Sequence, residues 1–220
     1  IPGLVVFAML FFLVPATDHS SKAGVQQGLR QSLSAVWQPL SRLYILVVIR
    51  SAVQMCFVNF LPLYFSQKGL PPLMAGKVTT LFLFFGALGG FSGGTLADKF
   101  GGKNVISFSM LFSTPLIMSF LLTDGVSSYL LLALGGVVLL STAPVNVVMA
   151  QNLVPHNASV VSALMMGLAW GVGGMFVPLI GRIADAAGLG RALMVVALRP
   201  LIGFVVAVFL PRERVAEAVA

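Results

Sequence analysis

Six long apolar runs constrain the fold of this chain more than any other feature of its sequence. Each has about the 20 residues that a helix needs to cross the hydrocarbon core of a bilayer. The runs cover 43–65, 75–97, 103–123, 129–151, 158–180 and 191–210. Backbone groups in lipid must be hydrogen-bonded, and the runs lack the period-two alternation of strands. The sequence therefore predicts an all-α membrane protein with six complete transmembrane helices.

The composition supports lipid as the solvent of this chain. Charged residues make up 9% and hydrophobic residues 58% of the sequence, whereas soluble domains have about 25% and 45–50%. The net charge is +7, but the basic residues form no patch interleaved with aromatic side chains, so we expect no nucleic-acid partner. A single cysteine, Cys56, leaves no internal disulfide to form.

The first 42 residues differ from the rest of the chain. The run 1–15 is short, and it starts at Ile1 without the charged region of a signal peptide. We therefore expect a fragment, or a gene read from an internal position, with a truncated helix in front. The polar segment 16–42 carries apolar residues at three- or four-residue spacing, namely Val25, Leu29, Leu33, Val36, Trp37 and Leu40. This spacing favours an amphipathic helix on the membrane surface, with a flexible linker as the alternative.

The distribution of basic residues predicts the orientation. One side of the membrane would hold segment 16–42 and most of the loop cations, namely Lys22, Arg30, Arg42, Lys99, Lys103, Arg212 and Arg214. The other side would hold Lys68 and Arg191, with Lys77 and Arg182 near the ends of runs. Cytoplasmic loops carry the excess of Lys and Arg. We therefore expect segment 16–42 and the C-terminus to be cytoplasmic.

Glycine and charge are concentrated around residues 86–103. Gly86, Gly90 and Gly94 are four residues apart, a spacing that lets two helices approach closely in lipid, and Asp98 continues the same face. A carboxylate is unfavourable at the C-terminal end of its own helix. We therefore expect the N-terminus of another helix, Lys99 or Lys103 to stabilise Asp98. The segment is interpreted as a conformational latch made of Gly86, Gly90, Gly94, Asp98, Lys99, Gly101 and Lys103.

The stretch 94–103, GTLADKFGGK, resembles the signature loop of the major facilitator superfamily. It departs from the family pattern at Gly102, where a basic residue is usual. Residues 181–188, GRIADAAG, echo the same pattern on the other side of the membrane. Three further stretches, 60–69, 151–174 and 178–188, are similar to the fosmidomycin-resistance type of drug exporter.

The resemblance implies an architecture and a function. Residues 1–15 would be the end of the first half, 16–42 the central cytoplasmic linker, and 43–220 the C-terminal six-helix transport bundle of a major-facilitator fold. The partners implied are the bilayer, a missing N-terminal six-helix half and a small-molecule substrate. The activity implied is proton-driven export of small drugs, including anionic phosphonates, across a bacterial-type inner membrane. A proton gradient, and no cofactor, would then supply the energy.

Three polar residues within the runs are candidate substrate-binding residues. Arg50 lies about two turns into its run and shares a helix face with Gln54, so the pair could hold an anionic head group. The alternative is that Arg50 snorkels to the membrane surface. Asn146 follows Pro144, where a broken helix would free backbone carbonyls along the substrate path. Arg199, near the middle of the last run, is either a cavity residue or a tolerated anomaly.

Other polar and aromatic residues of the runs have structural interpretations beside functional ones. Gln151 is expected to hydrogen-bond between helices, and Trp170 either packs or stacks on a substrate. The six acidic residues all lie in loops, at the ends of runs or in the tail, and none lies in the middle of a run. They are Asp18, Asp98, Asp124, Asp185, Glu213 and Glu217. The main titrating carboxylate of a proton-driven carrier is therefore expected in the missing half.

An enzyme is not expected. Catalysis or metal binding would need clustered His, Cys, Asp or Glu, and the two histidines and one cysteine lie far apart. No catalytic residue and no metal ligand is assigned. A metabolite or sugar carrier of the same superfamily, and a non-transporting membrane remnant, remain as alternatives.

Overall fold

The structure is a computed structural model that describes residues 36–210. The predicted segment 1–15, residues 16–35 of the predicted segment 16–42 and the basic C-terminal tail lie outside the described residues. No strand occurs within the described part of the chain. Six helical segments there are long and apolar enough to cross a membrane, which confirms the all-α prediction and makes the chain a multi-pass integral membrane protein.

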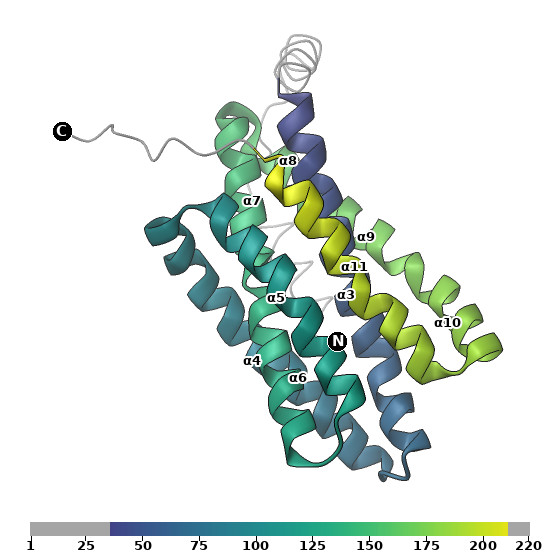
Figure 1. The fold of residues 1–220 in the computed structure, drawn as a ribbon. Coiled ribbons are helices and arrows are strands. Elements are labelled where there is room, and N and C mark those ends of the chain that lie inside the picture. Colours follow the sequence, from purple (N-terminus) through teal and green to yellow (C-terminus); the bar gives the residue numbers. More distant parts are fainter. Residues whose placement is uncertain (1–35, 211–220) are drawn as a thin grey trace, which may run out of the picture. The chain divides into compact units, whose positions relative to one another are not determined.

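The helices run antiparallel along the bundle, from α3 to α11 (Figure 1). Four of the segments are α3 (Trp37–Gln67), α4 (Pro72–Phe100), α5 (Gly102–Leu122) and α11 (Leu189–Val208). The fourth segment is divided into α6 (Val126–Leu140) and α7 (Thr142–Leu153). The fifth is the most broken, with η1 (Pro155–Asn157), α8 (Ala158–Ala163), the π-helical turn η2 (Leu164–Leu168), α9 (Ala169–Gly174) and α10 (Phe176–Ala187).

Helix α3 is longer than predicted. It begins at Trp37, inside the segment expected to be a linker, and its first turns continue into the membrane-spanning part. The apolar side chains Trp37 and Leu40 of the predicted surface helix therefore belong to α3, and Leu40 is buried in the bundle.

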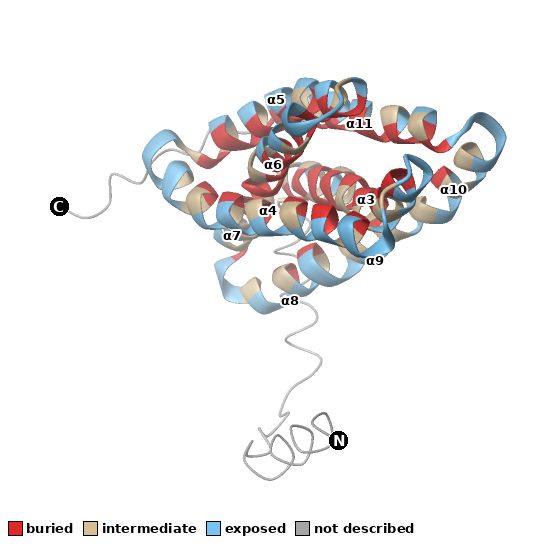
Figure 2. Ribbon diagram, turned by 90° about the horizontal axis from the view of Figure 1, so that it is seen from below, coloured by how far each residue is buried: buried red, intermediate tan, exposed pale blue. Residues whose placement is uncertain are grey.

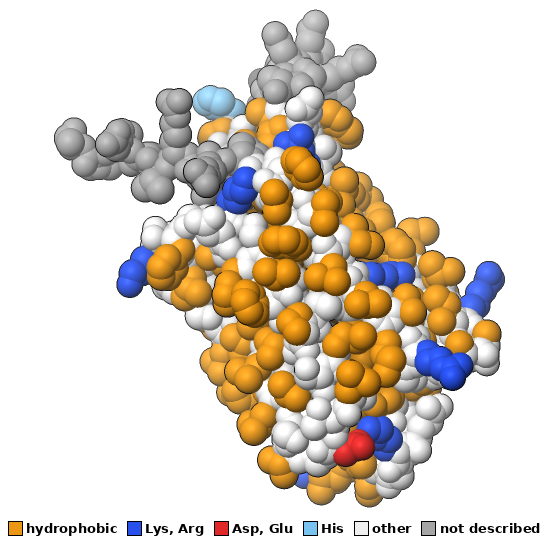
Figure 3. All heavy atoms as spheres, viewed as in Figure 1, with side chains coloured by type: hydrophobic (Ala, Val, Ile, Leu, Met, Phe, Trp, Pro, Cys, Tyr) orange, Lys and Arg blue, Asp and Glu red, His pale blue; other side chains and the backbone are white. Residues whose placement is uncertain are grey.

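Aromatic packing around α3 forms much of the core. The ring of Phe57 lies 5.9 Å from that of Phe82 on α4 and 6.4 Å from that of Phe120 on α5, measured between centroids. Buried residues gather on the helix faces that point toward one another (Figure 2). Hydrophobic side chains also cover the visible outer surface, with most Lys and Arg toward the two ends (Figure 3). An apolar exterior of this kind is stable in lipid.

Two turns at opposite ends of the bundle share one geometry. Gly101, between α4 and α5, and Gly188, between α10 and α11, have φ of +85° and +91°, a region that favours glycine. Each amide donates to the carbonyl four residues earlier, at 2.8 Å to Ala97 and 2.9 Å to Ala184. The similarity of segments 94–103 and 181–188 in the sequence is therefore also a similarity of backbone structure.

The glycine contact between α4 and α6 uses partly different residues from those predicted. A Cβ at Gly89 would lie 2.7 Å from the Val137 Cα, and one at Gly93 would lie 2.7 Å from the Ser141 carbonyl carbon. Gly86 faces the Leu140 side chain, as expected of a contact glycine. In contrast, a Cβ at Gly90 would reach only the Leu140 carbonyl oxygen, at 4.0 Å, and one at Gly94 would meet nothing within 4 Å. The close contact with α6 therefore follows Gly86, Gly89 and Gly93. Gly90 and Gly94 make no such contact within residues 36–210, and their part in the predicted latch stays a prediction.

Two cations bind the C-terminal end of α11. Arg42 Nη1 donates to the Phe209 carbonyl at 2.6 Å, and Lys103 Nζ donates to the carbonyls of Val208 and Leu210 at 2.7 and 2.6 Å. Cations are favourable there because the last carbonyls of a helix are unpaired and carry partial negative charge. Lys103 is therefore engaged with α11, and the expectation that it neutralises Asp98 is wrong.

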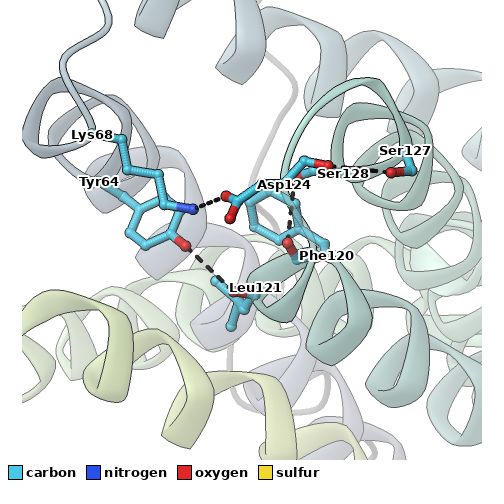
Figure 4. Close-up of polar contacts among 7 residues, drawn as sticks. All are labelled: Tyr64, Lys68, Phe120, Leu121, Asp124, Ser127 and Ser128. Atoms are coloured by element: carbon cyan, nitrogen blue, oxygen red, sulfur yellow. Dashed lines mark hydrogen bonds and ion pairs between the residues drawn. The ribbon is translucent and has the colours of Figure 1, made fainter.

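At the other end of the bundle, Lys68 and Asp124 form the one ion pair that the structure shows within residues 36–210, with Nζ and Oδ1 2.6 Å apart. Figure 4 shows this pair beside Tyr64, whose ring centroid lies 4.9 Å from Nζ. The hydrogen bond that Lys68 donates to Asp124 raises the pKa of Lys68 above its ordinary value. The pair joins the end of α3 to the loop between α5 and α6.

Breaking this ion pair is expected to have a small, pH-dependent effect. The pKa of Lys68 is raised in the folded protein. The stabilisation that the ion pair gives to folding is therefore complete below the ordinary lysine pKa, and it is lost as the pH rises through the raised pKa. Exposed pairs contribute at most about 1 kcal/mol, so Lys68→Met should lower the melting temperature at pH 8 by no more than about 2–4 °C. Thermal unfolding at pH 8 and pH 11 measures this. The difference between the two proteins should shrink at pH 11, and Lys77→Met serves as control; an unchanged difference at pH 11 would contradict the assignment.

Candidate functional site

A cavity of about 400 Å³ lies between α3, α7, η2 and α9. Its walls are mostly apolar, and it is lined by Val47, Arg50, Ala143, Pro144, Val147, Val148, Gln151, Met165, Met166 and Trp170. Small-molecule sites have this size and this character, with a few polar groups fixing the orientation of the ligand. Arg50 and Gln151 are the polar side chains here.

Arg50 is buried and unneutralised. Its side chain is 3% exposed, and its guanidinium lies 5.8 Å from the centroid of the Trp170 ring. Nη1 donates to Gln54 Oε1 at 2.9 Å, while Nε has no partner. No carboxylate within residues 36–210 pairs with it. A cation within a membrane-spanning helix usually faces a cavity or a charged partner. Arg50 lines the cavity and does not snorkel to the surface.

The predicted partners of Arg50 occupy different positions. Gln54 holds the guanidinium by a hydrogen bond but does not line the cavity. Asn146 is fully buried, and neither atom of its amide has a partner in the described part of the chain. It also does not line the cavity. The structure thus brings Arg50 and Gln54 together but leaves Asn146 outside this cavity.

Arg199 forms a second arginine–aromatic stack. Its guanidinium lies 4.5 Å from the centroid of the Phe176 ring on α10, and its Nη1 is buried without a partner within residues 36–210. Arg50 stacks on Trp170 of α9, so both mid-span arginines rest on the same broken segment. Arg199 is not among the residues that line the cavity.

The broken fifth segment supplies one wall of the cavity. Met165 and Met166 belong to the π-helical turn η2, and Trp170 follows it in α9. Turns of this kind occur frequently at functional sites. Sequence reasoning missed both methionines, because a π-helical turn leaves no signal in an apolar run.

The latch residues lie around the α4–α5 turn. Asp98 is exposed, and it lines a second cavity of about 110 Å³ together with residues of α7, among them Pro144 and Val148. These two residues also line the larger cavity. Helix α7 therefore separates the predicted latch from the Arg50 cavity.

Comparison with known proteins identifies the family. The profile of the Major Facilitator Superfamily matches residues 1–178. This chain belongs to that superfamily. The signature-like stretch 94–103 accordingly forms the α4–α5 turn of a Major Facilitator Superfamily protein.

Curated superfamily relatives include transporters and drug-resistance proteins. The chain is 42% identical over 134 residues to the MFS-type transporter YfnC of Bacillus subtilis (strain 168), covering 61% of the chain and 32% of YfnC. It is 31% identical over 176 residues to the fosmidomycin resistance protein of Escherichia coli (strain K12), covering 80% and 43%. It is 29% identical over 198 residues to the multidrug efflux pump Tap of Mycolicibacterium fortuitum, covering 87% and 47%.

A solved superfamily structure shares the fold. FucP in the outward conformation superposes with a TM-score of 0.73 at 22% identity, over 94% of this chain and 52% of FucP. The chain spans less than half the length of the curated relatives it matches. The described helices thus correspond to one part of a longer superfamily fold.

Proposed function

We propose that this bundle is the C-terminal half of a secondary active transporter. It would export small drugs and would be of the same type as the fosmidomycin resistance protein. The observation that carries the proposal is Arg50, a buried cation without a carboxylate partner within residues 36–210, which lines a cavity of about 400 Å³. The 31% identity to the fosmidomycin resistance protein supports this substrate class.

The cavity suits a small molecule with one acidic group and an apolar body. A phosphonate or carboxylate beside Arg50 would supply the missing counter-charge through charge-assisted hydrogen bonds. Trp170 stacks beside the guanidinium, and the valine and methionine walls would contact the apolar part. A cationic drug would be repelled.

A proton gradient would drive the cycle in this proposal. No acidic residue lies within the middle of a described helix, so the main titrating carboxylate is assigned to a missing N-terminal half. The chain would lie in a bacterial-type inner membrane with its C-terminus cytoplasmic. Arg42, Lys99 and Lys103, near the ends of helices at one end of the bundle, support that orientation.

The latch would change its contacts as the two halves rock against each other. In this proposal the latch consists of Gly86, Gly90, Gly94, Asp98, Lys99, Gly101 and Lys103. The position of the α4–α5 turn next to α7 supports it, because α7 also lines the substrate cavity. Asp98 is the charged group that would exchange partners.

Drug export by living cells tests this function. A fosmidomycin-sensitive bacterium would express the chain with or without the first six-helix half of the Escherichia coli fosmidomycin resistance protein. We expect resistance only when both halves are present, and loss of that resistance in Arg50→Met.

The controls separate the parts of the proposal. Membrane insertion of each variant is verified by fractionation. Resistance from the chain alone would contradict the need for a missing half. No resistance from inserted protein in either case would overturn drug export in favour of a metabolite or sugar carrier or a non-transporting remnant.

A further inference from the structure

Gln151 is the second polar group of the Arg50 cavity, and its amide is held in one orientation. Its Nε2 donates to Ser162 Oγ of α8 at 2.7 Å, which confirms the expected hydrogen bond between helices. The Ser162 hydroxyl in turn donates to the Ala158 carbonyl at 2.7 Å. A serine hydroxyl has a single proton. Ser162 therefore can only accept from Gln151, and this fixes which end of the amide is the nitrogen.

The oxygen of the same amide remains available. Gln151 Oε1 accepts no hydrogen bond from any residue within 36–210, yet it is not one of the buried unpaired atoms. It is therefore accessible, and Gln151 lines the cavity. The cavity thus carries hydrogen-bond donors on Arg50 and a fixed acceptor on Gln151.

The two groups are spread along the cavity. Gln151 is hydrogen-bonded to Ser162, whereas Arg50 stacks on Trp170, and these two residues of the fifth segment are eight residues apart, a rise of about 12 Å. The apolar side chains of Met165 and Met166, which line the cavity, lie between these two positions in the segment. A ligand that contacted both ends would have to carry its polar groups at the two ends of an apolar body.

From this arrangement we infer that Gln151 is a specificity-determining residue that accepts a hydrogen bond from the substrate. This inference rests on the proposed function, and it narrows the substrate class. The favoured ligand carries an acidic group for Arg50 and, at the other end of a short apolar chain, a hydroxyl or N–H donor for Gln151. Ser162 acts as a positioning residue, since it holds the amide with its oxygen free.

A designed ligand series tests the inference by binding. Trp37 and Trp170 are the two tryptophans of the chain, so Trp37→Phe makes the fluorescence of Trp170, a cavity residue, the reporter. The full chain in lipid nanodiscs is titrated with alkylphosphonates of three to six carbons that end in a methyl, a hydroxyl or a methoxy group. The methoxy ligand has an acceptor but no donor.

The parent protein should prefer the hydroxyl ligand over the methyl ligand by about five- to tenfold, the effect of one hydrogen bond. Gln151→Met should remove this preference and leave the affinity for the methyl ligand unchanged. Ser162→Ala frees the amide to turn its N–H₂ into the cavity, so the methoxy ligand should gain affinity in that variant alone. Gln67→Met, a change at an exposed glutamine on α3, is the matched control.

The outcomes distinguish the inference from the function on which it rests. If no phosphonate binds, or if Arg50→Met binds them all as the parent does, the anion site and the proposed function fail. If Arg50→Met loses binding but Gln151→Met keeps the preference for hydroxyl, only the role of Gln151 is overturned. A uniform loss of affinity in Ser162→Ala without a methoxy gain would assign Ser162 a purely structural role and would also overturn the inference.

Discussion

Gly89→Ala and Gly93→Ala are each expected to lower the free energy of unfolding of the bundle by about 3 kcal/mol, the upper end of what one added methyl group costs in a packed interior. The new Cβ would overlap the backbone of Val137 or Ser141 on the facing helix. A side chain could rotate away, but a helix backbone moves only if α4 and α6 separate. Denaturant unfolding of the purified chain in mixed micelles measures the change.

Two other glycines of α4 provide matched control variants. Gly90→Ala and Gly94→Ala add the same methyl group one residue further along, where a Cβ would have 4.0 Å or more of clearance. These variants should be neutral or more stable by about 0.5–1 kcal/mol, because alanine favours helix more than glycine does. Equal destabilisation by all four substitutions would contradict the assignment of the contact face.

Arg50→Met is expected to weaken the binding of anionic ligands by about 100-fold, while it makes the empty protein more stable. A hydrogen bond to a charged group contributes about 1.5–3 kcal/mol, and Arg50 is the cation that lines the cavity. The same side chain is buried with an unpaired Nε and no carboxylate partner within residues 36–210. Replacing a buried charge by an apolar side chain of similar length removes that desolvation cost.

Ligand titration and thermal unfolding of the same preparation measure both effects. Arg199→Met is the matched control, because it removes a second mid-span arginine–aromatic stack that does not line the cavity. The affinity of this variant for anions should stay within about twofold of that of the parent protein, well below the tenfold change that corresponds to about 1.4 kcal/mol. Equal loss of binding in both variants would point to a general effect of charge and would contradict a specific site at Arg50.

The number and positions of the spanning helices were predictable, because few backbone structures satisfy their hydrogen bonds within lipid. Each of the six apolar runs became a spanning segment, since length and hydropathy alone decide that a segment crosses the bilayer. The division at Ser141 lies three residues before Pro144, where the sequence predicted a broken helix. The π-helical turn at 164–168 contains no proline, and hydropathy gives no sign of it.

The sequence alone did not predict which glycines of α4 contact α6. Glycines at 86, 89, 90, 93 and 94 contain two overlapping series, and both have the spacing of a close helix contact. The facing residues of α6 determine which series is used, and a single sequence does not reveal them. Arg50 was easier to find, because a charge within an apolar run is costly wherever it points. Gln151 was predicted only as an interhelical contact, since its free oxygen depends on Ser162.

The hydrogen bond from Arg42 to Phe209 joins the first described helix to the end of the last. Trp37, where α3 begins, is five residues from Arg42, or about 7–8 Å along the helix. A tether of about eight residues spans more than 20 Å when extended, which is more than this helical stretch and the Arg42 side chain together. Joining positions 36 and 210 in this way would turn the bundle into a circular polypeptide. New ends could then be opened at any of the other helix connections, so the order of the helices along the chain is separable from their arrangement in the membrane.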